Sequence, residues 1–189
     1  MVRKYDSSGR KRAAEQTRKS IIEAALRLHW EGITGYEPLA REAGCSVPSV
    51  RKHYPSKEDL YRDCTQTFAE SLTMPDLNAL GRITDPARRL EEAVSELCRI
   101  HDAMFGYAWF GAHAREGSPT LSAVMKAYDE LADSMTEIVV QKDPSKYSVV
   151  RGFLDYLTYR ALRLSGGLAP EPARQELIAA IRPLVTEGE

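Results

Sequence analysis

An all-α fold is predicted for this chain of 189 residues, and three observations predict it. Apolar residues recur at spacings of three and four along nearly the whole chain, which is the period of an amphipathic helix. No segment shows the apolar–polar alternation of a half-buried strand. The pairs Asp85-Pro86, Ser118-Pro119 and Asp143-Pro144 each place a capping side chain before a proline, as helix starts commonly do.

The first helix is expected over residues 12–30, and a short second helix follows it. The apolar stripe of the first helix consists of Ile21, Ile22, Ala25, Leu26, Leu28 and His29. Gly32 interrupts the pattern, and residues 34–37 then match a capping box. In such a box Thr34 and Glu37 each satisfy a free backbone N–H of the other. The second helix is therefore expected to have Thr34 at its N-terminus.

A third helix is expected directly after a tight turn. Gly44 ends the second helix and supplies the positive φ that the turn needs. Ser46 caps the third helix, whose Val50 and Tyr54 face the core. Two short helices joined by a turn containing glycine form a helix-turn-helix, whose second helix enters the major groove of DNA.

Four longer helices are expected in the rest of the chain. Two begin at Pro86 and Pro119, a third covers residues 144–165 and ends at Gly166-Gly167, and the last covers 172–186. The helix over 144–165 carries apolar residues on two faces, which predicts burial on two sides. We expect this helix and the last one to form a homodimer interface. The alternative is that both belong to the core of the monomer.

Charge is distributed unevenly along the chain although the net charge is only −1. Residues 1–62 hold 13 basic and eight acidic side chains, whereas the remainder holds 13 basic and 19 acidic ones. This asymmetry indicates that the first third meets a polyanion. The expected organisation is a flexible basic arm at 1–12, a helix-turn-helix domain at 13–56, and a larger domain at 57–189.

Several classes of protein are disfavoured by the composition. The longest uncharged apolar-rich run, residues 103–114, is far shorter than the roughly 20 residues of a membrane-spanning helix. No apolar stretch follows the basic N-terminus, so a secretory signal is not expected. Three widely spaced cysteines indicate free thiols in a reducing compartment, so a cytoplasmic protein without membrane contact is expected.

Enzymatic motifs and cofactor sites are not expected either. The chain has no G-x-S-x-G, no phosphate-binding glycine-rich loop and no H-E-x-x-H. Cys98 and His101 stand three residues apart and would suit zinc if further ligands joined them. Both lie on the apolar stripe of their helix, which favours packing over metal binding. We therefore expect no catalytic residues, no metal and no cofactor.

Three segments, Ile21–Leu26, Leu39–Ser46 and Val50–Leu60, together resemble the N-terminal domain of the Tet-repressor (TetR) family of bacterial transcription regulators. The resemblance covers residues 21–60 and combines a helix, an Ala-Gly turn and a Ser-Lys-Glu start of a fourth helix. It implies an all-α homodimer that binds a palindromic double-stranded DNA operator. It further implies a repressor released by a small-molecule effector, which the domain over 57–189 would bind.

The resemblance also implies which residues contact DNA. The recognition helix falls on Ser46–His53, and Lys57 matches a lysine that contacts phosphate. Thr34, at the expected start of the second helix, suits an anion. Arg51 stands where the family usually has a tyrosine that contacts the DNA backbone, and it either keeps a phosphate contact or reaches a guanine. The predicted DNA-binding residues are Thr34, Ser46, Val47, Pro48, Ser49, Arg51, Lys52, His53 and Lys57.

The groove-facing positions implied for the recognition helix are Val47, Pro48, Ser49 and Lys52. The Val47-Pro48 pair replaces a more polar pair, and such a surface reads thymine methyl groups or DNA shape. The basic arm at 1–12 is either a further DNA contact, through the minor groove, or a solubilising tail.

An effector pocket is expected among aromatic and methionine side chains in the second part of the chain. Ligand pockets are mostly apolar with a few polar anchors, which favours an apolar or aromatic small molecule here. The alternative for each residue is that it belongs to the core. The predicted ligand-binding residues are His101, Met104, Phe105, Trp109, His113, Met125, Tyr128, Tyr156 and Arg160.

Two alternatives to a repressor remain open at the level of sequence. One is a small helical enzyme or ligand carrier that kept a non-functional helix-turn-helix, which only the aromatic and histidine cluster favours. The other is a transcriptional activator of the same fold, which shares every residue argued above.

Overall fold

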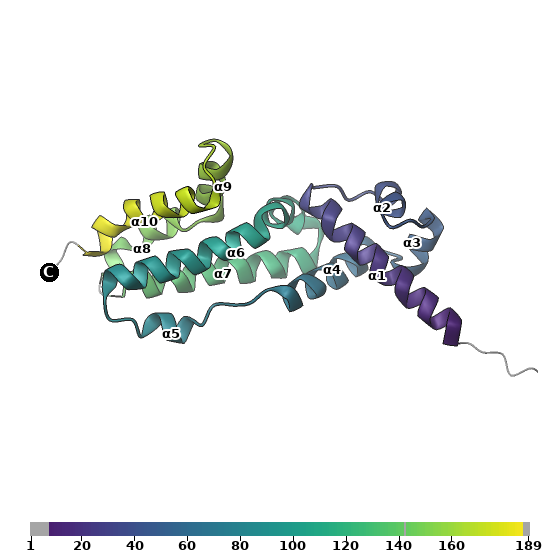
Figure 1. Cartoon of the computed structure of the whole chain (residues 1–189), viewed down its shortest axis with the longest axis horizontal. Helices are drawn as coiled ribbons and strands as arrows, with labels where there is room; N and C mark the ends of the chain where they lie inside the picture. The colour runs from purple at the N-terminus through teal and green to yellow at the C-terminus, as the bar shows by residue number, and fades with distance from the viewer. Residues whose placement is uncertain (1–7, 142, 187–189) are drawn as a thin grey trace, which may run out of the picture. The chain divides into compact units, whose positions relative to one another are not determined.

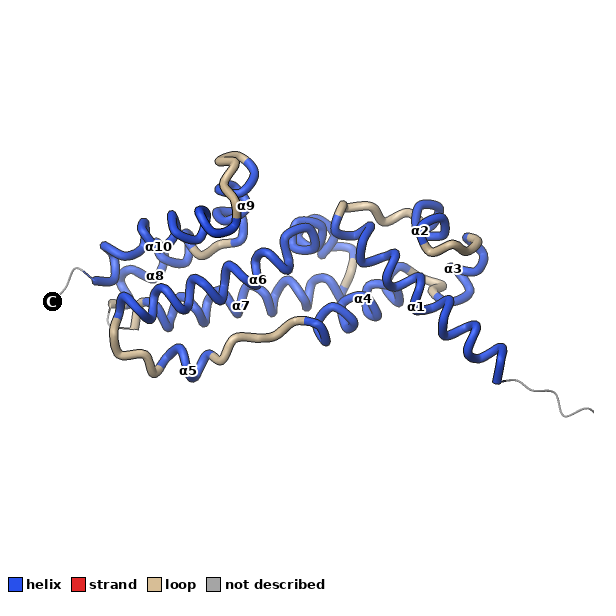
Figure 2. Tube along the Cα trace, viewed as in Figure 1, coloured by secondary structure: helices blue, strands red, loops and turns tan. Residues whose placement is uncertain are grey.

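The predicted all-α fold is confirmed by a computed structural model of the chain. It describes residues 8–141 and 143–186, and within this part every regular element is a helix (Figure 2). Residues 1–7, which include Arg3 and Lys4 of the expected arm, lie outside the described residues. No helix in the described part is both long and apolar enough to cross a membrane.

The chain divides into two compact units, each of which is described by itself. The N-terminal unit comprises residues 8–71 with Trp109–Ser122, and the C-terminal unit comprises Leu72–Ala108 with residues 123–186. The domain boundary expected after residue 56 falls directly before the helix that starts at Lys57. The helix that starts at Lys57 belongs to the N-terminal unit because its Leu60 and Cys64 lie in the core of that unit.

The N-terminal unit begins with four helices (Figure 1): α1 (Ser8–Trp30), α2 (Tyr36–Glu42), α3 (Val47–His53) and α4 (Lys57–Ser71). Helix α1 starts at Ser8, earlier than the expected residue 12, so residues 10–12 of the expected flexible arm are helical. The end of α6 (Pro86–Ala114) and the start of α7 (Pro119–Val139) complete the unit.

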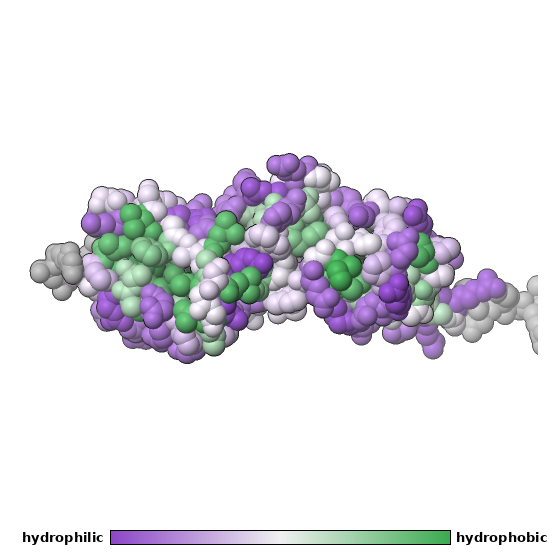
Figure 3. All heavy atoms as spheres, turned by 90° about the horizontal axis from the view of Figure 1, so that it is seen from above, coloured by the Kyte–Doolittle hydropathy of each residue, from purple (hydrophilic) through white to green (hydrophobic). Residues whose placement is uncertain are grey.

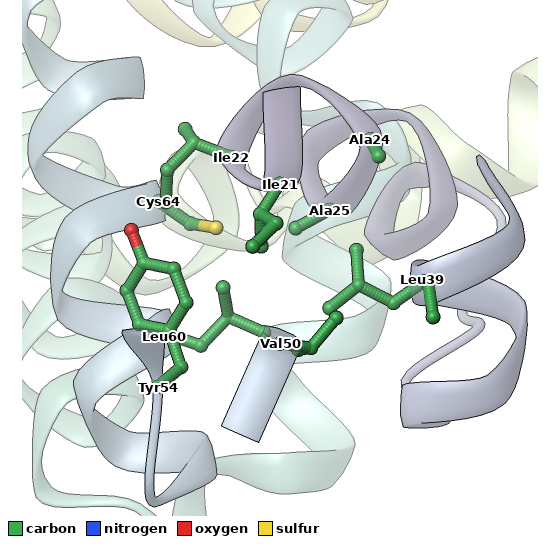
Figure 4. Packing of buried hydrophobic residues seen from close by; sticks show 10 residues of the cluster. Ile21, Ile22, Ala24, Ala25, Leu39, Val50, Tyr54, Leu60 and Cys64 are labelled. Atoms are coloured by element: carbon green, nitrogen blue, oxygen red, sulfur yellow. The ribbon is translucent and has the colours of Figure 1, made fainter. Parts of the chain in front are cut away.

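The core of the N-terminal unit is built from one face of each of these four helices (Figure 4). Each side chain leaves water by inserting between the other helices, and apolar burial stabilises such a cluster by about 25 cal/mol for each Å² removed from water. The buried residues are Ile21, Ile22, Ala24, Ala25, Leu39, Ala40, Val50, Tyr54, Leu60 and Cys64.

The turn between α2 and α3 has the predicted geometry. Gly44 has a φ of +65°, a left-handed conformation that a residue with a Cβ adopts only under strain. The Ser46 side chain caps α3 by accepting a hydrogen bond from the Ser49 backbone N–H at 3.3 Å. The predicted helix-turn-helix is therefore present as a local structure.

The predicted capping box at the start of α2 is wrong. Gly35 is the N-cap, it makes no side-chain capping bond, and Thr34 lies one residue before it. Pro38 explains the shift. With Gly35 as N-cap, Pro38 is the third helical residue, whose N–H would be unbonded anyway, whereas a start at Thr34 would require Pro38 to donate a helical hydrogen bond.

The C-terminal unit contains α5 (Leu77–Gly81) and most of two long helices, α6 (Pro86–Ala114) and α7 (Pro119–Val139). The short 3-10 helix η1 (Arg115–Gly117) separates α6 from α7. Both predicted helix starts are confirmed: Asp85 accepts the Ala87 N–H at 3.1 Å, and Ser118 accepts the Leu121 N–H at 3.2 Å.

The single helix predicted over residues 144–165 is wrong. The chain forms a 3-10 turn, η2 (Pro144–Lys146), then α8 (Tyr147–Phe153) and α9 (Tyr156–Leu164). Asp155 has extended backbone dihedral angles and caps α9 by accepting the Leu157 N–H at 2.8 Å. The Leu154 carbonyl, which the break leaves without a helical partner, accepts a hydrogen bond from His101 at 3.1 Å.

The last helix, α10 (Pro170–Thr186), starts two residues before the predicted position and packs on α8 and α9. Gly167, with a φ of +66°, lies in the connection that follows α9 as predicted. The helices of the expected dimer interface are thus α8, α9 and α10.

We predict that Leu60→Ala destabilises the protein by about 2–5 kcal/mol, because truncation of a fully buried leucine removes apolar contacts and leaves a cavity. Leu60 is 2% exposed and lies in the core of the N-terminal unit. Chemical denaturation followed by circular dichroism measures the change. Thr67→Ala, at an exposed position of the same helix, should change the stability by no more than about 0.5 kcal/mol.

Candidate functional site

Helix α3 is fastened to the N-terminal unit by one face and exposes the opposite one. Val50 is completely buried and Tyr54, the C-cap of α3, is 1% exposed. Pro48, Arg51 and Lys52 are exposed. A helix held in this way can present its outer side chains to a groove without changing its packing.

The remaining residues predicted on the recognition helix are less free. Ser46 uses its hydroxyl group to cap α3. Val47, Ser49 and His53 are half-buried, and Val47 packs against the core of the unit. The expectation that Val47 faces the groove therefore applies to only part of its surface, whereas Pro48 and Lys52 are fully available.

Lys57 is exposed at the first position of α4, and the start of that helix is tightly held. The Ser56 hydroxyl accepts the Asp59 N–H at 3.2 Å. The neighbouring Glu58 accepts hydrogen bonds from the Ser118 hydroxyl at 2.6 Å and the Thr120 N–H at 2.8 Å. These donors lower the pKa of Glu58 below its usual value. The backbone that carries Lys57 is thereby fixed to the start of α7.

Tyr54 connects the end of α3 to three other helices. Its hydroxyl group donates to Asp63 of α4 at 2.9 Å, and Arg18 of α1 donates its Nε–H to the same carboxylate at 3.0 Å. Burial and the contact with Asp63 raise the pKa of Tyr54, so the phenol stays protonated and remains a donor. The Tyr54 backbone carbonyl accepts a hydrogen bond from the Tyr36 hydroxyl of α2 at 3.3 Å.

Tyr36, Tyr54, Asp63 and Arg18 were not among the residues predicted to form the site. Tyr36 was noticed only as part of the expected capping box, and Asp63 and Arg18 carry no motif. The two ends of the Arg18–Asp63 bond are 45 residues apart in the chain, and no local pattern signals such a pair.

Ion pairs in the N-terminal unit leave the cations of α3 and of the start of α4 unneutralised. Cations of α1 and α4 have carboxylate partners: Arg18 with Asp63, Lys19 with Glu23, Arg27 with Glu42, and Arg62 with Asp59. Among the described residues Arg51, Lys52 and Lys57 form no ion pair. The positive charge that lacks an internal partner therefore includes α3 and the first residue of α4.

His29 lies in an aromatic cluster near Lys57. Its ring stacks on Phe110 at 5.3 Å and meets the edge of Tyr61 at 5.5 Å, measured between ring centroids. Burial and the nearby charge of Lys57 lower the pKa of His29 to about 4. At neutral pH this histidine is therefore an uncharged part of the packing between α1, α4 and the end of α6.

His101 is the centre of the residues that were predicted to bind an effector. It is 1% exposed and bonds to the Tyr128 hydroxyl through Nδ1 and to the Leu154 carbonyl through Nε2. Since a carbonyl only accepts, Nε2 carries the proton, and Nδ1 accepts from Tyr128. Burial lowers the pKa of His101 to about 4, which is consistent with this neutral form.

Aromatic rings surround His101 within contact distance. Tyr159 stacks on it at 5.3 Å, and the rings of Tyr128 and Tyr156 meet it edge-on at 5.6 and 6.0 Å. Arg160 lies over the Phe105 ring at 5.4 Å. Such centroid distances are those of packed aromatic pairs, so a ligand that enters between these rings has to displace them.

The structure brings together most of the predicted ligand-binding residues but not all of them. His101, Met104, Phe105, Met125, Tyr128, Tyr156 and Arg160 belong to the C-terminal unit, where Met104 and Met125 are buried. Trp109 and His113 belong to the N-terminal unit and are exposed, with their rings 4.2 Å apart.

Tyr159, Asp102 and Arg163 were missed by the sequence analysis, although they support the stacking face of His101. Tyr159 is completely buried and donates to Asp102 at 2.7 Å. Arg163 forms an ion pair with the same carboxylate. Tyr159 follows Tyr156 by one helical turn, which is the only signal in the sequence that pointed to it.

Cys98 lies buried one turn from His101, and burial raises the pKa of its thiol to about 12. A protonated thiol is a poor metal ligand. Within residues 8–141 and 143–186 no group of three or more His, Cys, Asp or Glu side chains is arranged to hold a metal ion.

Comparison with known structures identifies the fold. A transcriptional regulator from Rhodococcus sp. Rha1 is similar with a TM-score of 0.57 and 20% sequence identity, over 93% of this chain and 96% of that chain. A transcriptional regulator of the TerR/AcrR family from Aquifex aeolicus VF5 is similar with a TM-score of 0.54 and 16% identity, over 89% of this chain and 99% of that chain. No protein-family model and no curated protein matches the sequence. The chain thus has the fold of these two regulators.

We predict that the free energy of unfolding falls as the pH is lowered from about 6.5 towards 4. The pKa values of His29 and His101 are lowered to about 4 in the folded protein, whereas the unfolded chain titrates near 6.5. The unfolded state therefore binds more protons in this window, and each histidine removes up to about 1.4 kcal/mol per pH unit. Urea denaturation between pH 7 and pH 4.5 measures this slope.

Variants assign the slope to particular residues. His101→Gln should lower the stability at pH 7 but make its pH dependence shallower. His113→Gln, at an exposed position, should leave the slope unchanged. Equal slopes in His101→Gln and the unmodified protein would contradict the assignment.

Proposed function

We propose that the protein is a sequence-specific, DNA-binding transcriptional regulator of the TetR family. One observation carries the proposal: Arg51, Lys52 and Lys57 are exposed without an ion pair among the described residues, on a recognition helix and at the helix start beside it. Other cations of the same unit are paired with carboxylates. Unneutralised cations on a helix-turn-helix attract DNA phosphates.

The two similar structures support this proposal. Both are named transcriptional regulators, and both match this chain over about nine-tenths of its length or more. The motif segments over residues 21–60 lie in α1, α2, α3 and the start of α4, which is where the TetR family places its DNA-binding elements.

DNA binding would divide the work between two groups of side chains. Lys57 and Arg51 would contact phosphates and fix the position of the unit on the duplex, because such contacts carry no sequence information. Pro48 and Lys52, on the outer face of α3, would meet base edges. The Pro48 ring has no donor, so it would select thymine methyl groups or groove shape, whereas Lys52 would donate to guanine.

The dimer is proposed from apolar side chains that one copy leaves exposed. Val149 of α8 is 52% exposed, and Leu157 and Leu164 of α9 are each 57% exposed. Apolar surface gathers over the C-terminal helices (Figure 3). A second copy would cover these side chains, since exposed apolar patches mark interaction sites. Two-fold symmetry would then place two copies of α3 on half-sites roughly 34–36 Å apart.

Repression and release by a small molecule are the regulatory part of the proposal. An apolar or aromatic effector would bind among the rings around His101 in the C-terminal unit, with His101 or Arg160 orienting its polar end. Because those rings are in contact, binding would have to change their arrangement. An effector that prefers the changed arrangement lowers DNA affinity by the amount of that preference.

Selection of bound sites from a random duplex library tests the proposed function directly. The purified protein should enrich a palindromic sequence at moderate salt. Enrichment of no sequence would refute the proposal and favour an enzyme or ligand carrier with a non-functional helix-turn-helix.

On the selected duplex, we predict that Lys52→Ala and Lys57→Ala each weaken binding roughly tenfold. The Lys57→Ala variant should also reduce the slope of log affinity against log salt concentration by about 0.9, the value for one lost phosphate contact. Fluorescence anisotropy at several salt concentrations measures both quantities. Arg27→Ala is the matched control, because Arg27 is already paired with Glu42 at 2.9 Å, and it should leave the salt slope unchanged.

We further predict that Leu157→Glu converts a dimer into a monomer, because each copy would bring an unpaired carboxylate into the apolar interface. Light scattering with size-exclusion chromatography measures the mass at micromolar concentration. Thr67→Glu, which adds a carboxylate at an exposed position of α4 outside these helices, serves as a control that should not change the mass. A dimer that survives Leu157→Glu would place the interface elsewhere.

A further inference from the structure

Tyr36 and Arg51 form a stacked pair that links the start of α2 to the last turn of α3. The central carbon of the Arg51 guanidinium lies 5.3 Å from the centroid of the Tyr36 ring. This distance is within the range of a cation–π contact. The pair joins the two helices of the helix-turn-helix on its solvent side, because Arg51 is exposed and Tyr36 is half-buried.

The position of Arg51 around α3 shows which part of DNA it addresses. Val47, Val50 and Tyr54 face inward, and a helix advances by about 100° per residue. Lys52 and Pro48 therefore lie opposite the core, whereas Arg51 lies on the flank, beside α2. In a docked helix-turn-helix the first helix crosses the DNA backbone and the recognition helix fills the groove. The flank next to α2 thus faces the sugar-phosphate wall of the groove.

Tyr36 is itself held in place, so it can serve as a fixed platform. Its hydroxyl group donates to the Tyr54 backbone carbonyl at 3.3 Å, and its ring packs against the core of the unit. Val50 and Tyr54, which are at most 1% exposed, hold the helix that carries Arg51. Platform and arginine are therefore both tied to the same rigid unit.

The guanidinium of Arg51 is available to bind a phosphate. It forms no ion pair with any described carboxylate, in contrast to Arg18, Arg27 and Arg62. Stacking occupies the face of a guanidinium, while the N–H groups at its edge remain free for a bidentate contact. An arginine that is restrained before binding also loses less side-chain entropy when it binds.

We propose that Tyr36 is a positioning residue that holds Arg51 as a clamp on one DNA phosphate at the rim of the major groove. This inference rests on the proposed function, and it makes Tyr36 act through Arg51. The contact is independent of the base sequence, because phosphate groups carry no information about the bases.

A double-mutant cycle on DNA binding tests the clamp. Arg51→Ala should weaken binding roughly tenfold and reduce the salt slope by about 0.9. Tyr36→Leu should weaken binding about two- to fivefold, the range expected for loss of an exposed cation–π contact. The double variant should bind no more weakly than Arg51→Ala alone, because the platform has no function without the arginine. The measurements are made on the selected duplex and on a scrambled duplex, with equal losses expected on both.

Conservative variants separate positioning from a merely structural role. Tyr36→Phe loses the hydrogen bond to Tyr54 but keeps the ring packed on the core and under the guanidinium, so it should bind within about twofold of the unmodified protein. It provides a second variant at this position in case Tyr36→Leu does not fold. Arg41→Ala is the matched control, since Arg41 is an exposed arginine of α2 away from the stacked pair, and it should not alter the salt slope. Thermal melts of all variants give the effect on folding separately.

Two results would overturn the clamp without touching the proposed function. Additive losses in the double variant would make Tyr36 a structural residue only. A loss confined to one base position of the selected site, with an unchanged salt slope, would make Arg51 a reader of bases. If the unmodified protein selects no sequence at all, the proposed function fails instead, while the cycle on the scrambled duplex still reports on the clamp.

Discussion

The burial of Tyr54 at the end of α3 is the constraint on which the proposed DNA-binding surface depends. Tyr54 is 1% exposed, and its hydroxyl group donates a hydrogen bond to Asp63 of α4. Its backbone carbonyl accepts a hydrogen bond from the Tyr36 hydroxyl of α2. One residue thereby fixes α3 to α2 before it and to α4 after it. A buried phenol without these partners would be costly, so the aromatic ring and the polar contacts have to be kept together. The rigidity of the outer face of α3 follows from this arrangement.

Charge in the N-terminal unit is organised by pairing as well as by number. A simple excess of basic residues would not distinguish a DNA-binding surface from a solvated helix face. Arg18, Lys19, Arg27 and Arg62 each have a carboxylate partner, so their charges are neutralised locally. Arg51, Lys52 and Lys57 are exposed and have no ion pair among the described residues. Such cations can displace the counterions that are bound to a polyanion.

The C-terminal unit is organised around a neutral histidine. His101 donates a hydrogen bond to the carbonyl that the break between α8 and α9 leaves unbonded, and it accepts a hydrogen bond from the Tyr128 hydroxyl of α7. Three helical segments thus meet at one imidazole, and the proposed effector site is built from the rings that pack on it. A molecule that disturbs these rings also disturbs the break between α8 and α9. Val149 of α8 and Leu157 of α9 are the exposed apolar residues on either side of this break. Effector binding and dimer geometry therefore both depend on the segment that contains α8 and α9 in the proposed mechanism.

The sequence by itself determined the all-α class, the starts of α6 and α7, the glycine turn and the capped helix α3, because each depends on neighbours within a few residues. The residue at which α2 starts also depends on the local sequence, but the constraint that Pro38 imposes outweighs the apparent capping box at Thr34. Only the tertiary structure decided that α8 and α9 are separate, since the apolar period continues across Asp155 and the compensating bond comes from His101, 53 residues away. It likewise decided which cations are paired and which rings surround His101. Hydrogen bonds and ion pairs between distant segments depend on how helices pack, and no pattern along the chain encodes that packing directly.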